Sequence, residues 1–373
     1  MTEVKKNKKG VALQKPNNTQ HKFPYEWTLK DANFTKDKGT VFSCFACGGG
    51  STMGYKLAGF DVLGCNEIDP KMIEAYKVNH KPKYAYLEPI QTFKLRKDLP
   101  KELYNLDILD GSPPCSSFSM AGNREKDWGK EKKFREGQAE QVLDNLFFDF
   151  IDLAKELQPK VVVAENVKGL LLGNAKEYVR KIYRDFDEAG YYCQHWLLDA
   201  SKMGVPQRRE RVFFICLRKD LAEPFLYQQD MFTVNPKLEL KFNEPEINYG
   251  TIKTELGRVA SNLYYERWTK REQTDTSFGD ITKRLNSSGS CFSDVFAKDE
   301  LPLPTITSKG GIYDFENGHF ISDDSFKKGG SYPLDYDFKG NKVAYLVGMS
   351  VPPVMTAQIA TKIYEQWLSK LLT

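Results

Sequence analysis

The sequence predicts an α/β fold, with one domain built on a parallel sheet and a second, smaller, irregular β-rich domain. Apolar, strand-like runs alternate with helical segments across residues 40–222, a pattern typical of a parallel sheet covered by helices. Residues 223–342 break the alternation and are richer in proline, glycine, asparagine and aspartate. Residues 343–373 include an amphipathic segment at 354–372, which we expect to form a helix that packs back on the first domain.

The composition is that of a globular protein. Of the 373 residues, 40% are hydrophobic and 28% are charged, and this length suits two or three domains. No apolar run has the length of a membrane span, and the N-terminus lacks the apolar segment of a signal peptide, so we expect no membrane association. Seven scattered cysteines favour free thiols in a reducing cytoplasm over a disulfide framework.

Residues 1–39 are predicted to form a basic flexible arm. They carry nine lysines and four acids, with few apolar residues, so they offer little surface for burial. Basic tails attract phosphate backbones without reading sequence. The net charge of the whole chain is only +4, which is too small to indicate nucleic-acid binding by itself.

The elements of the first domain follow from their apolar patterns. Residues 40–60 read as a strand, a glycine cluster and a helix. Further strands are expected at 60–69, 105–110, 160–167, 191–200 and 211–217. Helices are expected at 70–80, 141–158 and 175–190, with Pro70 suited to a first helical turn. The run KVVVAENV at 160–167 is continuously apolar at its start, as in a sheet buried on both faces.

A glycine-rich turn and an acid suggest a nucleoside-containing cofactor. FACGGGSTMG at 45–54 follows the first strand and opens a helix, so backbone N–H groups can approach a ligand there. Glu67 ends the next strand, where an acid typically binds ribose hydroxyls. Each feature alone also fits a flexible turn or a surface acid. Cys44 and Cys47 form a C-x-x-C pair without a second ligand pair nearby, so we expect no metal.

GSPPCSSFS at 111–119 places a cysteine in a stiff loop after a strand. Pro113 and Pro114 restrict the backbone before Cys115. In an open α/β sheet the carboxyl ends of the strands are where ligands bind. None of the four histidines lies in a Cys-His protease signature. From the spacing alone, a structural cysteine and a catalytic cysteine remain equally good interpretations.

Two further segments are expected at the same edge of the sheet. Glu165 and Asn166 end the apolar strand at 160–167, and a carboxyl group near apolar walls can act as a proton donor. QRRER at 207–211 precedes another strand and supplies cationic hydrogen-bond donors.

These segments together resemble the DNA (cytosine-5) methyltransferase family of bacteria and phages. The resemblance rests on FACGGG, GSPPCSSFS, LDNLFFDF, AENVKGL, PQRRERVFFICLR and GMSVPPVM in this order. It covers roughly residues 40–220 and 300–373, and the ordered set is highly specific. It implies a Rossmann-like, S-adenosylmethionine-dependent methyltransferase sheet, with catalytic and cofactor-binding residues in 40–222 plus 343–373.

The resemblance implies a covalent mechanism in which Cys115 attacks C6 of a cytosine that is flipped out of the duplex. Glu165 would hydrogen-bond and protonate N3, with Asn166 as a positioning residue beside it. Arg211 would hold the cytosine O2, and Arg209 would support the site. C5 would then take the methyl group of S-adenosyl-L-methionine, leaving S-adenosyl-L-homocysteine.

The cofactor contacts are implied in the same way. The family pattern carries over to Phe45, Gly48, Gly49, Gly50, Glu67, Ile68, Pro114, Leu146 and Val351. Three positions depart from the pattern: Cys47 replaces a usual glycine, Pro89 a frequent acid and Met349 a usual asparagine. These departures leave the adenine contact open.

The family's target-recognition region corresponds to residues 223–342. Its recurring threonine-containing segment resembles LPTITSKGG at 303–311, although an ordinary turn fits this segment equally well. A charged loop at 116–138 would act as a lid over DNA. The implied DNA-binding residues are Ser119, Arg124, Gln207, Thr305, Thr307 and Lys309.

We therefore expect a monomeric, cytoplasmic enzyme that methylates double-stranded DNA. Functional pairing with a restriction endonuclease, a phage origin and a solitary enzyme all stay open at this point. Two alternatives stay open, the same chemistry on tRNA and a non-catalytic DNA-binding relative. The second alternative is disfavoured because Cys115, Glu165, Arg209 and Arg211 are all present.

Overall fold

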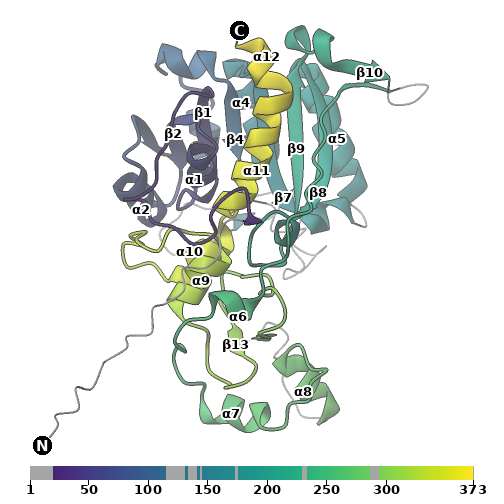
Figure 1. Cartoon of the computed structure of the whole chain (residues 1–373). Helices are drawn as coiled ribbons and strands as arrows, with labels where there is room; N and C mark the ends of the chain where they lie inside the picture. The colour runs from purple at the N-terminus through teal and green to yellow at the C-terminus, as the bar shows by residue number, and fades with distance from the viewer. Residues whose placement is uncertain are drawn as a thin grey trace, which may run out of the picture.

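The computed structural model describes residues 20–114, 145–172, 175–228, 233–285 and 294–372, together with the backbone of 131–132 and 141–142. A seven-stranded sheet with the order β3-β2-β1-β4-β7-β9-β8 forms the centre of the larger domain (Figure 1). Its strands are β1 Thr40–Cys44, β2 Asp61–Glu67, β3 Tyr84–Leu87, β4 Ile108–Gly111, β7 Val161–Val167, β8 Tyr191–Asp199 and β9 Glu210–Arg218.

The α/β prediction is confirmed, but the sheet is not entirely parallel. β9 runs antiparallel to both of its neighbours, β7 and β8, whereas β1, β2, β3, β4 and β7 pair in parallel. A short connection at 200–209 joins β8 to β9, and a connection of that length between adjacent strands returns the chain antiparallel. As a result, the first residues of β9 lie at the same edge as the last residues of β4 and β7.

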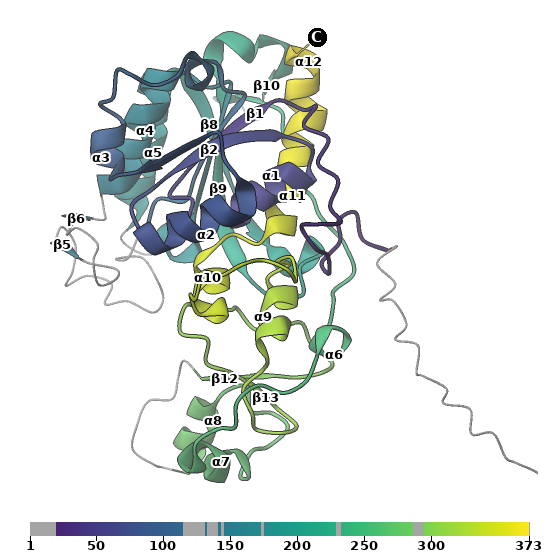
Figure 2. The same ribbon diagram turned by 90° about the vertical axis from the view of Figure 1, so that its left-hand side faces the viewer.

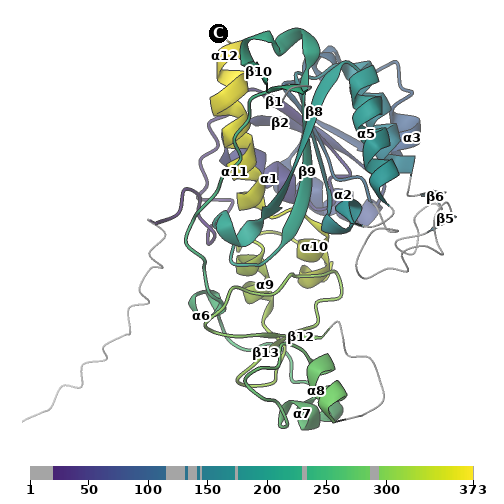
Figure 3. The same cartoon turned by 90° about the vertical axis from the view of Figure 1, so that its right-hand side faces the viewer.

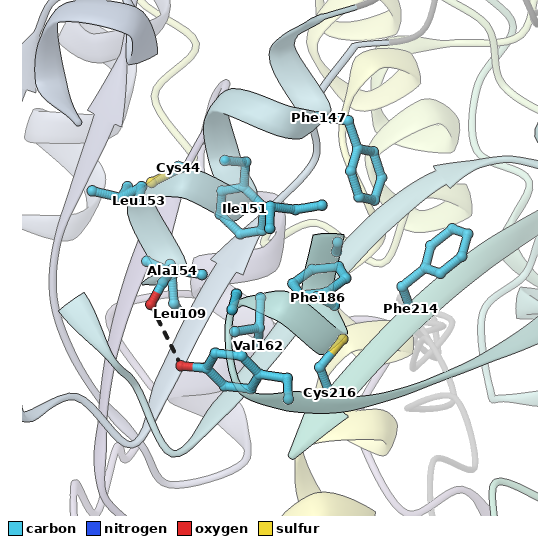
Figure 4. Close-up of a cluster of buried hydrophobic side chains, with 14 of the residues drawn as sticks. Cys44, Leu109, Phe147, Ile151, Leu153, Ala154, Val162, Phe186, Phe214 and Cys216 are labelled. Atoms are coloured by element: carbon cyan, nitrogen blue, oxygen red, sulfur yellow. Dashed lines mark hydrogen bonds between the residues drawn. The ribbon is translucent and has the colours of Figure 1, made fainter. Parts of the chain in front are cut away.

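Helices cover both faces of the sheet (Figures 2 and 3). One face carries α1 Gly50–Leu57 and α11 Pro353–Ile363, which bury Val41, Ile108 and Val163. The other face carries α4 Leu146–Leu157 and α5 Lys176–Glu188. Side chains alternate along a strand, so the residues next to Ile108 and Val163, such as Leu109 and Val162, point to this second face. Figure 4 shows this second cluster, with Phe147, Phe186 and Phe214 packed together.

The C-terminal helix confirms its predicted place against the first domain. The helical run Val343–Leu371 is long and apolar enough to cross a membrane, but 78% of its most apolar window is buried inside the protein. This burial identifies it as a core helix. It comprises α10 Val343–Met349, α11, the π-turn η10 Tyr364–Leu368 and α12 Ser369–Leu371.

A smaller lobe lies at the end of the molecule away from α12 (Figure 1). It has its own small core, in which Phe278, Phe296 and Tyr313 pack together. The lobe and its junction contain short elements, namely α6 Tyr249–Ile252, α7 Asn262–Trp268, α8 Phe278–Arg284, β12 Val295–Ala297, β13 Ile312–Asp314 and α9 Asp323–Gly329. The segment 303–308 between them forms no strand of its own, apart from one bridge from Leu303 to Gln207.

The remaining elements are the 11-residue helix α2 and several shorter ones. They are α2 Pro70–His80, α3 Ile90–Phe93, β5 Glu131–Lys132, β6 Gln141–Val142, β10 Leu226–Gln228, β11 Val234–Pro236 and the 3-10 turns at 101–105, 168–171, 200–202, 219–221 and 223–225. Leu238 and Leu240 pack into the core of the larger domain, so the lobe begins later than the predicted boundary at residue 223.

Residues 20–39 do not form the flexible arm that composition predicted. Tyr25 and Trp27 are buried, and Trp27 Nε1 donates to the backbone oxygen of Ser331 at 2.9 Å. Two large aromatic side chains therefore anchor this otherwise polar segment, because their burial outweighs its low overall hydrophobicity. The more basic part of the arm, residues 1–19, lies outside the described residues.

We predict that Gly54→Ala destabilises the protein because α1 packs directly on α11. A Cβ atom at Gly54 would lie 2.3 Å from the backbone oxygen of Pro353 and 2.5 Å from Cβ of Thr356. Such overpacking lowers the free energy of unfolding by about 2 kcal/mol, measurable by urea denaturation. Glu74→Ala, on the exposed side of α2, is the control and should change it by no more than about 0.5 kcal/mol. Equal midpoints for the two variants would contradict this packing argument.

Candidate active site

Three strand ends meet at one edge of the sheet. β4 ends at Gly111 and leads into the loop of Pro113 and Pro114, while β7 ends with Glu165 and Asn166. β9 begins there because it runs antiparallel, and Arg211 pairs in register with Val167. The structure thus brings together the predicted segments that precede Cys115, contain Glu165 and contain Arg211. Cys115 itself lies outside the described residues.

Glu165 and Arg211 form a half-buried ion pair. Arg211 Nε lies 2.9 Å from Oε1 of Glu165, and their side chains are 15% and 12% exposed. Arg211 Nη1 also donates to the backbone oxygen of Glu210 at 2.8 Å. Burial lowers the pKa of Arg211, and the neighbouring Glu165 carboxylate opposes that shift. The pair places a carboxyl group and a guanidinium side by side, which suits hydrogen bonding to a heterocycle with both donor and acceptor atoms.

Asn166, which was predicted as a positioning residue beside Glu165, links two segments at this edge of the sheet. Its Nδ2 donates to the backbone oxygen of Pro113 at 3.2 Å, and its Oδ1 accepts from the backbone N–H of Val167 at 2.8 Å. The side chain is 3% exposed. It therefore ties the Pro113–Pro114 loop to the end of β7, which sets the loop close to Glu165.

Arg209, which was predicted among the catalytic residues as a support of the site, is held by three backbone carbonyl groups. Its guanidinium is buried and donates to the backbone oxygens of Ile306, Gly348 and Ser350 at 2.9, 3.0 and 3.0 Å. Burial, together with the charge of Arg211, lowers the pKa of Arg209 to about 9. Arg209 therefore joins the start of β9 to the loop at 306 and to the end of α10, and supports the site from behind.

A pocket opens beside this edge, next to the ends of β1, β2, β3 and β4. It takes in about 760 Å³ of space, part of which is open solvent. Four predicted cofactor residues line it: Phe45, Glu67, Ile68 and Pro114. The other lining residues are Cys47, Asn66, Asp69, Met72, Glu88, Pro89, Ile90, Ser112, Tyr345 and Met349.

Glu67 is held rigidly at the floor of the pocket. Its Oε2 accepts from the backbone N–H of Cys47 at 2.7 Å, and its Oε1 accepts from those of Ile68 and Asp69, both at 2.9 Å. The residue is 7% exposed. Burial raises the pKa of Glu67, and these backbone hydrogen bonds oppose the shift. Each oxygen keeps acceptor capacity for a ligand hydroxyl, as a ribose-binding acid requires.

The remaining predicted cofactor residues lie behind the pocket wall. Gly48, Gly49 and Gly50 shape the turn into α1, and Gly49 adopts φ +83°, a left-handed conformation that favours glycine. Leu146 is fully buried against the sheet, and Val351 lies in the core beside α11. Neither side chain lines the pocket, because both belong to the inward faces of their segments.

The sequence did not identify several residues of this pocket. Met72 and Tyr345 come from helices, and only the tertiary structure brings them to the strand ends. Cys47, by contrast, carried a signal, because it replaces a glycine of the family pattern. Its φ is +48°, and that left-handed conformation explains the family's preference for glycine there. Pro89 and Met349, the other two departures, also line the pocket.

The predicted DNA-binding residues fall into three groups. Thr307 and Lys309 are exposed, and Thr305 is half-buried with its Oγ1 donating to the backbone oxygen of Arg208 at 2.6 Å. Gln207 is 1% exposed. Its Nε2 donates to the backbone oxygen of Gly329 at 3.1 Å and its Oε1 accepts from the backbone N–H of Ile306 at 2.9 Å, so its polar atoms are occupied within the protein and its contact with DNA stays a prediction. Ser119 and Arg124 lie outside the described residues.

Comparison with known families agrees with this geometry. The family model for C-5 cytosine-specific DNA methylases matches residues 39–365. The chain belongs to this family. The match spans both the sheet domain and the smaller lobe, so it includes every described part of the candidate site.

Curated relatives are Type II methyltransferases. M.FnuDI of Fusobacterium nucleatum is 38% identical over 181 residues, 48% of this chain and 47% of its own length. The match to that relative thus spans about half its length. M.DdeI of Desulfomicrobium norvegicum is 34% identical over 87% of this chain and 88% of its own length.

Solved structures support the fold. A putative DNA modification methyltransferase from an Escherichia coli prophage superposes with a TM-score of 0.59 at 19% identity, covering 88% of this chain and 99% of its own. DNMT2 of Spodoptera frugiperda gives a TM-score of 0.59 at 17% identity, covering 87% and 99%. At such identities, these two methyltransferases show a shared α/β fold.

We predict that Arg209→Lys destabilises the C-5 cytosine-specific methylase fold by about 2 kcal/mol, because a lysine ammonium cannot reach all three carbonyl oxygens. Urea denaturation measures the change. Arg208→Lys is the matched control, since the Arg208 side chain is 50% exposed and lies 3.8 Å from its acidic partner, Glu246. A stability loss as large in Arg208→Lys would contradict the assigned role of Arg209.

Proposed function

We propose that the protein transfers a methyl group from S-adenosylmethionine to C5 of a cytosine in double-stranded DNA. The observation that carries this proposal is the Glu165–Arg211 pair, which lies beside the Pro113–Pro114 loop and next to the pocket that contains Glu67. Family membership supports the reaction class. The pocket chemistry fits the cofactor, with Glu67 for the ribose hydroxyls and Ile68 and Phe45 for apolar contact.

The residues of this chain would divide the work as follows. The thiolate of Cys115 forms a bond to C6 of the flipped cytosine, and the electron pair moves into the ring. Glu165 gives a proton to N3, which prevents negative charge from accumulating there. Arg211 donates hydrogen bonds to O2. When bound, S-adenosylmethionine supplies the methyl group that C5 accepts. A water molecule then takes the C5 proton, the C5–C6 double bond re-forms as the Cys115 thiolate leaves, and N3 returns its proton to Glu165.

The ion pair has a consequence for substrate entry. Arg211 neutralises Glu165 in the described state, yet donation to N3 requires a protonated Glu165. An incoming cytosine that draws Arg211 toward O2 would open the ion pair and free the Glu165 carboxyl group to face N3. Base entry and opening of the Glu165–Arg211 pair are therefore coupled in this proposal.

We also propose that the smaller lobe contains the target-recognition residues. It presents exposed Thr307 and Lys309 on a segment that Arg209 holds through Ile306. The proposed recognition residues Thr307 and Lys309 are therefore linked, through Ile306 and Arg209, to the start of β9. The Type II names of the relatives support a role beside a restriction endonuclease.

The central prediction concerns Cys115. DNA that contains 5-fluorocytosine should form a covalent adduct with the protein in the presence of S-adenosylmethionine, because fluorine at C5 blocks release of the cysteine. Denaturing electrophoresis measures the adduct. Cys115→Ala should form none, whereas Cys44→Ala, which removes a buried thiol of β1, should still form it. An adduct with Cys115→Ala would show that Cys115 is not the nucleophile. Tritiated methyl groups appearing in tRNA and not in duplex DNA would show that duplex DNA is not the substrate.

A second prediction concerns Glu67. In the unmodified protein, the Glu67 carboxylate accepts hydrogen bonds from backbone N–H groups. Glu67→Gln places an amide N–H₂ group against these donors. S-adenosylhomocysteine should therefore bind 10- to 100-fold more weakly, a loss of about 1.4–2.8 kcal/mol in binding free energy. Isothermal calorimetry measures the affinity. Glu74→Gln on the exposed side of α2 is the control and should bind as the unmodified protein does. Unchanged affinity in Glu67→Gln would remove Glu67 from the cofactor site.

A further inference from the structure

A second hollow in the protein surface lies outside the candidate active site, between β8 and the first turns of α5 (Figure 3). We call it the α5 groove, and it takes in about 310 Å³. Half of its lining side chains are basic and half are apolar. They are Lys176, Arg180 and His195, and Leu170, Leu171 and Val179, respectively. The proposed mechanism gives no role to any of these residues.

The α5 groove lies near the sheet edge that carries the candidate active site. The turn η5 Lys168–Leu171, which contributes to the groove, follows β7 without a gap, and α5 begins five residues after that turn. Phe214 of β9 pairs with Ala164 of β7 on one side and with His195 of β8 on the other. Two strand spacings therefore separate the Cα atoms of Ala164 and His195, a distance of about 10 Å. Ala164 directly precedes Glu165, so the groove is close to the proposed position of the target base.

Lys176 supplies an unneutralised positive charge to the groove. Its side chain is exposed, and within the described part of the chain no carboxylate forms an ion pair with it. An ammonium group is a compact point charge with three hydrogen-bond donors, and phosphate is one of its usual partners in proteins. Lys176 is therefore available to bind an anionic group that enters the groove.

Arg180 is one helical turn after Lys176, so both side chains project from the same face of α5. Its guanidinium pairs with Glu177, and the two side chains are 72% and 75% exposed. Such exposed ion pairs contribute only about 0–1 kcal/mol, so a phosphate can displace Glu177 at little cost. The guanidinium also has five N–H donors, so it can bind a phosphate and keep its contact with Glu177.

His195 adds a neutral hydrogen-bond donor. Its Nδ1 is hydrogen-bonded to the hydroxyl of Tyr183, and its Nε2 has no hydrogen-bond partner among the described residues. Desolvation lowers the pKa of His195 and raises that of Tyr183, so the imidazole is neutral and the phenol is protonated near pH 7. When the Tyr183 hydroxyl donates to Nδ1, the ring proton is on Nε2, which can then donate to an oxygen atom of a ligand.

We propose that the α5 groove binds the phosphodiester backbone of the DNA duplex, a few base pairs from the target cytosine. This inference rests on the proposed function, because it requires DNA at the candidate active site. Phosphates follow one another about every 3.4 Å along each strand, so the separation of about 10 Å from Ala164 corresponds to roughly three base pairs. Lys176, Arg180 and His195 contact phosphate oxygens, and the apolar side chains face deoxyribose rings.

The groove gives the sheet domain its own contact with the duplex. The proposed recognition residues Thr307 and Lys309 lie on a different segment, which Arg209 holds through Ile306. Contacts with phosphates fix the position and orientation of a duplex but do not read its sequence. The α5 groove would therefore hold the DNA in register while the smaller lobe reads the bases.

The test is the salt dependence of DNA binding by Lys176→Gln and Arg180→Gln. Both side chains are exposed, so both variants should fold. Fluorescence anisotropy measures the affinity for fragments of unmethylated bacteriophage DNA, with S-adenosylhomocysteine present, between about 0.05 and 0.2 M potassium chloride. Each variant should reduce the slope of log affinity against log salt by about 1, and at about 0.1 M salt it should bind about 5- to 10-fold more weakly.

Lys155→Gln is the matched control. Lys155 is exposed in the last turn of α4, and α4 ends just before β7 begins, so it lies at the opposite edge of the sheet. The variant loses the same charge and should bind DNA as the unmodified protein does. The loss in Lys176→Gln should also be equal on a duplex of alternating adenine and thymine, because a backbone contact does not depend on sequence. A loss confined to the bacteriophage fragments would overturn the backbone assignment.

The other outcomes separate this inference from the proposed function. If the unmodified protein transfers no methyl group to cytosine in duplex DNA, the proposed function fails. If it does so, and Lys176→Gln and Arg180→Gln keep the salt slope of the unmodified protein, the inference alone fails. An equal loss in Lys155→Gln would overturn it as an effect of net charge. Calorimetric binding of inorganic phosphate that Lys176→Gln abolishes, with unchanged DNA affinity, would assign the groove to a small anion instead and also overturn it.

Discussion

The reversed direction of β9 is the constraint on which the rest of the site depends. In an all-parallel sheet, the first residues of a strand lie at the edge opposite the carboxyl ends. The short connection from β8 forces β9 to run antiparallel, and Arg209 and Arg211 thereby arrive beside the ends of β4 and β7. The Glu165–Arg211 ion pair and the support of the lobe through Ile306 both follow from this one topological feature.

Burial gives the site its chemical character. The same desolvation raises the pKa of Glu67 and Asp110 and lowers that of Arg209 and Arg211. Each group tolerates burial in a different way. Glu67 accepts three backbone N–H groups, Arg209 donates to three backbone carbonyls, and Arg211 pairs with Glu165. Groups bound by the backbone are held in place, whereas a pair of side chains can open to admit a substrate.

The second set of constraints comes from close packing around the cofactor pocket. Phe45, Cys47 and Gly49 all have positive φ, so the turn from β1 into α1 is tightly folded and brings the Cys47 N–H to Glu67. α1 in turn packs so closely on α11 that Gly54 leaves no room for a methyl group. The C-terminal helix therefore supports the cofactor loop, even though it is almost 300 residues away in the sequence.

Local sequence patterns were sufficient to predict the strands and most helices, because strand periodicity depends only on neighbouring residues. The ordered motifs were also sufficient to predict that the Pro113–Pro114, Glu165 and Arg211 segments meet at one edge of the sheet. They were misleading where a side chain's surroundings come from distant segments. Gln207 and Leu146 are buried, Arg209 bonds three remote carbonyls, and Trp27 anchors a segment of low hydrophobicity. The sequence by itself determined which chemical groups are available. Only the tertiary structure decided which of them face the pocket and which face the core, since burial and charge coupling arise from contacts between residues far apart in the chain.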